Sequence, residues 1–242
     1  SLLVMADGAR SPLAARLGIR HERNDYGTHA LVTQVEVDQA HGHWAYERFS
    51  QDGPIAFLPL RSNHFAVVWT LSNELIDDVM ALSDEALLAR LQAQIGYRLG
   101  TLVRAGERAT YPLGLIRSSE QVRRSLVLLG NAAHSLHPVA GQGFNLALRD
   151  VNRLSRLLSE AQNSDADALG DLTLLKRYLD SQASDQWQTV TFSDRVTRLF
   201  SNRQPLLSVA RNLGLLALDV LPPARSAFVA HTAGAALGAA NR

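Results

Sequence analysis

The feature that most constrains the fold is a short, uninterrupted apolar run at residues 125–129, Ser-Leu-Val-Leu-Leu. A run of this length without polar alternation is typical of a strand that is buried on both faces. Gly130 and a polar loop follow it, and from about Phe144 to Ala161 apolar residues recur at helical spacing. This order predicts part of an α/β sheet in which the loop lies at the carboxyl end of the strand, where such sheets bind ligands.

The first six residues form a second apolar run, Ser-Leu-Leu-Val-Met-Ala, which leads directly into Asp7-Gly8. This run has no initiator methionine, basic segment or cleavage-type site, so it is not a signal peptide. We expect a strand here, and a chain that opens inside a strand is expected to be a piece of a longer protein. The strands at residues 2–6 and 125–129 together predict one nucleotide-binding-type domain with an insertion. A single α+β domain is the alternative.

The stretch between these strands predicts an antiparallel block, because its turns are too short for the crossovers that parallel strands require. Ser83 is the expected N-cap of the second helix in this block, with Asp84 and Glu85 in the first turn. The expected elements, in order, are strands at residues 28–37, 44–50, 55–60 and 64–71, helices at 73–82 and 84–95, and one more strand at 102–113.

Helical patterns dominate the rest of the chain. One face of the helix that begins near Phe144 carries Phe144, Ala147, Leu148, Val151, Leu154 and Leu158. A polar linker at residues 163–170 and a long helix at Leu172–Phe200 follow. Residues 205–221 are apolar but interrupted, and they fall short of the ~20 residues that span a bilayer. We expect a core-packed helix there, with a surface that touches a membrane or a partner as the alternative.

Composition excludes several classes of function. The chain has 242 residues and no cysteine, which rules out disulfides, thiolate metal sites and a cysteine nucleophile. Its 24 basic and 23 acidic side chains leave a net charge of +1, so we expect no nucleic-acid partner.

The run from Gly130 to Asp150 is the most specific motif, with the sequence Gly-Asn-Ala-Ala-His-Ser-Leu-His-Pro-Val-Ala-Gly-Gln-Gly-Phe-Asn-Leu-Ala-Leu-Arg-Asp. It resembles the second flavin-binding motif of the FAD-dependent aromatic hydroxylases. The opening Asp7-Gly8-Ala9-Arg10-Ser11 resembles their Asp-Gly motif, and the resemblance covers essentially the whole chain. Within that family, Asn131 and the segment from Leu136 to Leu146 resemble the ubiquinone-biosynthesis hydroxylases, above all the 2-polyprenyl-6-methoxyphenol hydroxylase branch.

The resemblance implies FAD as cofactor and NAD(P)H as reductant. It implies hydroxylation of a polyprenylated phenol with O₂, through a flavin C4a-hydroperoxide. Asn131 takes the position of an acid that usually hydrogen-bonds the ribityl chain, and Pro138 lies near the ring and substrate. The implied cofactor-binding residues are Asp7, Asn131, Pro138, Gly141, Gln142, Gly143, Phe144 and Asn145. No residue is assigned as the base that activates the phenol.

The fold implied is a partial FAD-binding, Rossmann-like domain (α+β / α/β) with an inserted, mostly antiparallel β-sheet domain and a helical tail. We place the remainder of the FAD-binding domain at residues 1–20 and 100–200, the substrate domain at 21–99 and the C-terminal segment at 201–242. The expected apolar substrate-binding residues are Phe57, Pro59, Val67 and Trp69, with core packing open for about half of them.

The chain departs from the family in one respect: the GxGxxG segment that holds the ADP part of FAD is absent. We therefore expect the C-terminal portion of a longer enzyme, which alone binds FAD weakly or not at all and is inactive. The full enzyme is expected in the cytoplasm, with peripheral contact at the inner membrane face or membership of a ubiquinone-biosynthesis complex as options.

Other readings of the motifs are weaker. His134 and His137, and His41 and His43, have no third ligand in sequence, so no metal site is expected. Ser135 lacks the G-x-S-x-G turn of a hydrolase nucleophile. The remaining alternatives are hydroxylation of another aromatic substrate or ring position, and a non-catalytic flavoprotein-like scaffold subunit.

Overall fold

The computed structural model describes residues 1–50, 52–136, 142–164, 166–200, 220–223 and 226. Two compact units divide these residues: unit 1 holds Ser1–Asn24 and Gly114–Leu199, and unit 2 holds Asp25–Leu113. The mixed α and β architecture confirms the predicted fold class. The compact units divide at 24/25 and 113/114, whereas the predicted boundaries were 20/21 and 99/100. Most of the expected C-terminal segment lies outside the described residues.

A small sheet forms the centre of unit 1. β1 (Leu3–Met5) pairs in parallel with β9 (Leu126–Leu128), and β8 (Val122–Arg123) pairs with β9 on its other edge. Leu126 and Leu128 pack with Met5 and with residues in and around α1 (Pro12–Arg16), a helix that the sequence did not reveal. Val127 packs on the opposite side with Leu154, Leu175 and Tyr178. The prediction that this strand is buried on both faces is confirmed.

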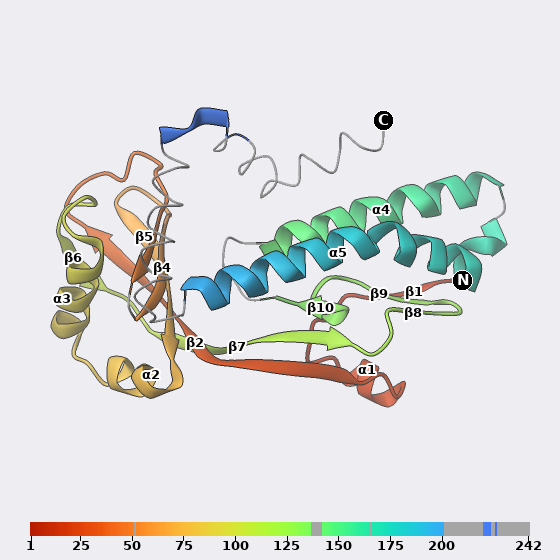
Figure 1. Cartoon of the computed structure of the whole chain (residues 1–242), viewed down its shortest axis with the longest axis horizontal. Helices are drawn as coiled ribbons and strands as arrows, with labels where there is room; N and C mark the ends of the chain where they lie inside the picture. The colour runs from red at the N-terminus through yellow and green to blue at the C-terminus, as the bar shows by residue number, and fades with distance from the viewer. Residues whose placement is uncertain (51, 137–141, 165, 201–219, 224–225, 227–242) are drawn as a thin grey trace. The chain divides into compact units, whose positions relative to one another are not determined.

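Two long helices lie side by side in unit 1 (Figure 1). α4 (Gln142–Ser164) and α5 (Leu172–Phe200) are joined by the segment predicted as a linker, of which residues 163–164 belong to α4 and Ala166–Gly170 form a 3-10 helix. α5 has the predicted bounds. On α4, the residues that become buried are Leu146, Asp150 and Leu154, whereas Phe144, Leu148 and Val151 are 72%, 51% and 45% exposed. Half of the apolar face expected from periodicity is therefore open.

Unit 2 is built on an antiparallel sheet, as predicted. Its strands lie in the order β2 (His21–Val37), β5 (His64–Ser72), β4 (Gly53–Pro59) and β3 (Tyr46–Ser50), with β6 (Leu102–Ala105) paired to β2. α2 (Asn73–Met80) and α3 (Asp84–Ile95) pack on one face of this sheet (Figure 1). Ser83 accepts a hydrogen bond from the Ala86 N–H, which confirms the predicted N-cap.

The single strand predicted at residues 102–113 is wrong. The chain forms β6 and then, after an interruption, β7 (Ala109–Ser118). At the interruption the Gly106 N–H donates to Gln34 O, and the Thr33 hydroxyl donates to Gly106 O. Arg108 then donates to the carbonyls of Met80 and Leu82 at the end of α2. These partners are distant in sequence, so the local strand pattern could not indicate the break.

A glycine pair in unit 2 tests how tightly the sheet is packed. Gly53 has φ +129°, and a Cβ there would lie 2.1 Å from Thr70 O; Gly27 has φ +65° with open space around it. Gly27→Ala should cost about 1–2 kcal/mol from backbone strain alone. Gly53→Ala should cost roughly 1–3 kcal/mol more, because the neighbouring strand must also shift. Urea unfolding of both variants measures this, and equal losses would contradict it.

Candidate functional site

Two loops follow the neighbouring parallel strands of unit 1. β1 leads into Asp7-Gly8, and β9 leads into Gly130-Asn131. The Leu129 N–H donates a hydrogen bond to Met5 O at 2.8 Å, so the parallel pairing continues to the point where both strands end. Because parallel strands end at the same edge of a sheet, the two loops lie beside one another, where open α/β sheets bind their ligands.

The first loop is fixed by side-chain hydrogen bonds of Ser11 and has an accessible main chain at Gly8. Ser11 donates to Asp7 Oδ2 at 2.6 Å and accepts from the Ala14 N–H at 3.0 Å as the N-cap of α1. Gly8 has φ +91°, and no atom would contact a Cβ added there. The exposed Asp7 carboxylate is therefore fixed by its own turn, and the main chain at Gly8 is accessible to a ligand.

The second loop is anchored through its main chain. Gly130 turns the chain at φ +59°, and a Cβ there would contact Ala147 of α4 at 3.7 Å. His21 Nε2 donates to Ala132 O at 3.0 Å, and the Ser118 N–H donates to Ala133 O at 2.9 Å. Asn131 lies just before these two anchors and is exposed. Its amide can both donate and accept hydrogen bonds.

The start of α4 adds main-chain donors. The first turn carries no acidic side chain, so nothing in it offsets the positive end of the helix dipole. A Cβ at Gly143 would contact only Leu136 Cβ, at 3.8 Å, while Phe144 is exposed and Asn145 half-buried. These groups fit an anionic or electron-rich ligand. Two further predicted residues, Pro138 and Gly141, lie outside the described residues, and of Gln142 only the backbone is described.

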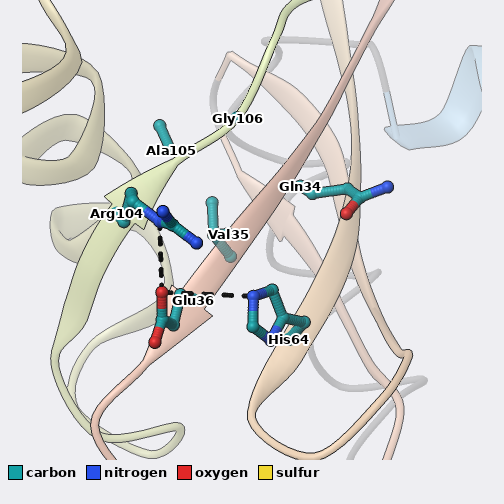
Figure 2. Close-up of a pocket in the computed structure, with 7 residues that line it drawn as sticks. All are labelled: Gln34, Val35, Glu36, His64, Arg104, Ala105 and Gly106. Carbon is teal, nitrogen blue, oxygen red and sulfur yellow. Dashed lines mark ion pairs between the residues drawn. The ribbon is translucent and has the colours of Figure 1, made fainter.

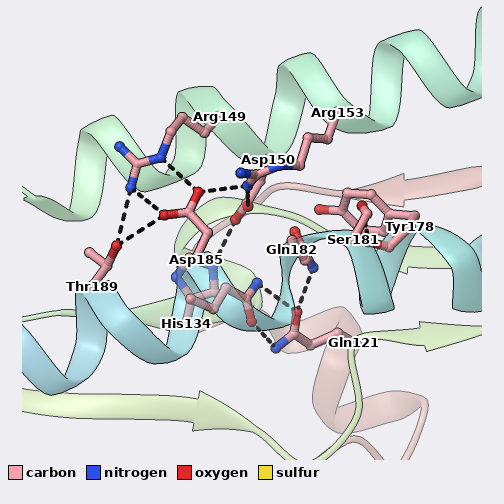
Figure 3. A network of polar contacts seen from close by, with 11 residues as sticks. Gln121, His134, Arg149, Asp150, Arg153, Tyr178, Ser181, Gln182, Asp185 and Thr189 are labelled. Atoms are coloured by element: carbon pink, nitrogen blue, oxygen red, sulfur yellow. Dashed lines mark hydrogen bonds and ion pairs between the residues drawn. The ribbon is translucent and has the colours of Figure 1, made fainter. Parts of the chain in front are cut away.

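A network of polar side chains connects α4 and α5 with His134 of β10 (His134–Ser135) and with Gln121, which precedes β8 (Figure 3). His134 donates from Nε2 to Asp150 Oδ2 at 2.9 Å. Asp185 on α5 accepts from Arg149 Nε at 2.8 Å and pairs with Arg153 Nη1 at 2.7 Å. Burial alone would raise the pKa of Asp185, but the two arginines outweigh it and lower that pKa.

Neutral polar groups complete the network. Burial and the negative charge of Asp150 raise the pKa of Tyr178, so its hydroxyl stays protonated. Gln121 accepts from the side-chain amides of Gln182 and Gln186, each at 3.1 Å. Sequence reasoning missed this network. The sequence does show charged residues at helical spacing, Arg149, Asp150 and Arg153. That they pair with Asp185 of the next helix becomes visible only once α4 and α5 are packed together.

The histidine pairs have structural partners. His41 Nε2 donates to Leu60 O at 3.1 Å, and its Nδ1 accepts from the His43 N–H at 2.9 Å. His134 is bound to Asp150, and His137 lies outside the described residues. Among the residues that the structure describes, no group of three or more His, Cys, Asp or Glu side chains could hold a metal ion.

The expected substrate residues all belong to unit 2. Phe57, Val67 and Trp69 are completely buried in its core, among side chains of α2 and α3. Pro59 lies at the end of β4 opposite Phe65 and is partly exposed. Three of the four expected substrate residues therefore pack in the core, which is the alternative that the sequence left open for about half of them. Their contact with a substrate stays a prediction.

A polar hollow in unit 2 contains none of the predicted site residues. Figure 2 shows it between β2, β5 and β6. Glu36 Oε2 lies 3.2 Å from Arg104 Nε and 4.0 Å from His64 Nε2. The charged groups on its wall thus already partner one another, and Asn63 also donates to Glu36.

The parallel strand pair, its glycine turns and the donor-rich loops define an α/β cofactor-binding protein. The FAD binding domain family matches residues 1–193, and the chain belongs to this family.

Curated proteins and solved structures that resemble the chain include hydroxylases and a probable FAD-dependent monooxygenase. The chain is 37% identical over 233 residues to ubiquinone hydroxylase UbiL of Rhodospirillum rubrum, covering 96% of this chain and 54% of UbiL. It is 34% identical over 220 residues to 3-demethoxyubiquinol 3-hydroxylase of Escherichia coli, covering 90% and 55%. The chain spans about half the length of the curated relatives it matches. Among solved structures, PqsL of Pseudomonas aeruginosa, a probable FAD-dependent monooxygenase, matches with a TM-score of 0.68 and 25% identity, over 84% of this chain and 57% of PqsL.

Asp185→Asn tests the ion pairs between α4 and α5. Folding lowers the pKa of the Asp185 carboxyl below its unfolded value of 3.8. The carboxylate therefore stabilises the fold at pH values above 3.8, and this contribution is lost as the pH falls through the folded pKa. At pH 7 the variant should lose about 3 kcal/mol, because two partly buried guanidinium groups lose their charged, buried partner. The gap should shrink below about pH 4. Urea unfolding across this range measures it, with exposed Asp180→Asn as control. A gap that widens at acid pH would contradict the assignment.

Proposed function

We propose that the polypeptide that contains this chain is an FAD-dependent monooxygenase that hydroxylates a polyprenylated phenol in ubiquinone biosynthesis, with NAD(P)H and O₂. The observation that carries the proposal is the position of Asp7-Gly8 and Gly130-Asn131 at the shared carboxyl edge of β1 and β9. The names of the two relatives, a ubiquinone hydroxylase and a 3-demethoxyubiquinol 3-hydroxylase, support the substrate class.

The proposed cofactor site uses the groups that the loops expose. Asn131 hydrogen-bonds the ribityl chain, and the main-chain N–H groups at residues 141–145 face the electron-rich ring system. Asp7, fixed by Ser11, binds near the pyrophosphate in this proposal. Pro138, which is outside the described residues, keeps the place near the ring and substrate that the family resemblance implies. FAD, when bound, accepts electrons from NAD(P)H and activates O₂ for transfer of one oxygen atom to the phenol ring. The protein binds and orients the reactants and excludes water from them.

The proposed substrate surface belongs to the sheet of unit 2. Phe57, Val67 and Trp69, buried beneath it, fix the positions of β4 and β5, and Pro59 contacts the substrate at the strand end. An apolar phenol suits such a surface because it has few polar groups to satisfy.

Membrane contact is a further part of the proposal. In the part of the chain that the structure describes, no helix is both long and apolar enough to cross a bilayer. Residues 205–221, where the sequence predicts an apolar helix, lie almost entirely outside that part. We propose peripheral contact at the inner membrane face through this segment, since a polyprenyl substrate partitions into lipid.

Activity is tested on the protein from the complete reading frame. Substrate-stimulated oxidation of NADH or NADPH, with one oxygen atom added to a polyprenyl phenol, is the expected result, followed by absorbance and mass spectrometry. Oxygen added at another ring position, or only to a non-prenylated aromatic, would identify the alternative hydroxylase. Absence of any turnover with tight flavin binding would identify a scaffold.

Flavin titration of the 242-residue chain alone is a second test. The chain lacks the GxGxxG segment that holds the ADP part of the cofactor, so we expect weak binding or none. Fluorescence quenching of FAD measures the affinity. A tight, stoichiometric complex would show that the loops of unit 1 suffice.

A further inference from the structure

One buried, hydrogen-bonded His–Asp pair connects the loop that follows β9 to α4, the helix that follows this loop. His134 and Asp150 are 4% and 1% exposed, and His134 Nε2 donates to Asp150 Oδ2 at 2.9 Å (Figure 3). A carboxylate this deeply buried needs a close partner, because desolvation disfavours an isolated charge. The pair therefore joins β10 to the third turn of α4, across the segment that includes the rest of the motif.

The other anchors of the loop lead elsewhere. Ala132 O accepts from His21 of β2, and Ala133 O accepts from the Ser118 N–H of β7. These bonds hold the loop on strands, whereas the side chain of His134 reaches α4. Asn131 is three residues before His134, and Gly143 and Asn145 lie in the first turn of α4. The His134–Asp150 pair thus connects the chain just after Asn131 to the helix whose first turn offers the main-chain donors.

Arg153 of α4 connects Asp150 to Asp185 of α5. Arg153 Nη1 lies 3.8 Å from Asp150 Oδ1 and 2.7 Å from Asp185 Oδ2, and Arg149 also binds Asp185. The two arginines and two aspartates balance in charge, and His134 adds a hydrogen-bond donor at Nε2. Its Nδ1 has no hydrogen-bond partner among the described residues. The cluster thus joins β10 to α4 and α5 through side-chain contacts.

We propose that His134, oriented by Asp150, is a positioning residue for the flavin: it holds Asn131 and the start of α4 in the spacing that binds the cofactor. This inference rests on the proposed function, since it assigns the cofactor to these loops. His134 does not contact the flavin. Its effect passes through the loop.

The test compares variants at position 134 in the protein from the complete reading frame. His134→Leu removes the donor and should raise the Kd for FAD about tenfold or more, since one charge-assisted hydrogen bond is lost. His134→Gln places an amide nitrogen near the position of Nε2, and should restore the affinity and the flavin absorption spectrum. His134→Asn is one carbon shorter and should not.

Leu175→Ala is the matched control for general loss of stability. Leu175, on α5, is fully buried in the apolar cluster with Val127, Leu154 and Tyr178, a cluster that includes neither His134 nor Asp150. It should lower the melting temperature while the Kd for FAD and the spectrum stay at parent values.

The outcomes separate the inference from the proposed function. Equal affinity in His134→Leu and the parent, or equal losses in the Gln and Asn variants, would overturn the positioning role. The same follows if Leu175→Ala weakens FAD as much as His134→Leu does. If the leucine variant does not fold, the Gln and Asn pair decides. A parent that binds no FAD overturns both proposals, and one that binds FAD without hydroxylating overturns the proposed function alone.

Discussion

The burial of β9 on both faces is the constraint on which unit 1 depends. Leu126 and Leu128 face α1, and Val127 faces α4 and α5, so a three-residue strand organises two separate clusters. Its parallel pairing with β1 determines where the strands end. Because parallel strands end at one edge, the loops after Met5 and Leu128 are brought together although more than a hundred residues separate them in sequence.

Polar burial then fixes how the helices sit on this sheet. α4 turns Asp150 inward and leaves Phe144 and Val151 exposed, the reverse of the usual orientation of a surface helix. Asp150 and Asp185 are held by a histidine and two arginines, and such charges are tolerated in the interior only when geometry and hydrogen bonds compensate desolvation.

The two units carry different parts of the proposed chemistry. Unit 1 contains the loops that we propose as the cofactor site. Unit 2 presents a sheet whose core is completed by Phe57, Val67 and Trp69 against α2 and α3. Membership of the FAD binding domain family supports the cofactor site proposed in unit 1. The chain covers about half of the hydroxylase UbiL, and the substrate surface proposed in unit 2 is tested by the activity assay.

The sequence by itself determined the elements whose signals are local. Ser83 and the bounds of α3 and α5 were predictable because capping and 3.6-residue periodicity act within a few turns, and the buried strand before Gly130 was predictable from its unbroken apolar run. Only the tertiary structure decided the break between β6 and β7, the inward turn of Asp150 and its pairing with His134. These depend on partners far away in sequence, such as Gln34 for Gly106 and Asp185 for Arg153, and no local window contains both members of such a pair.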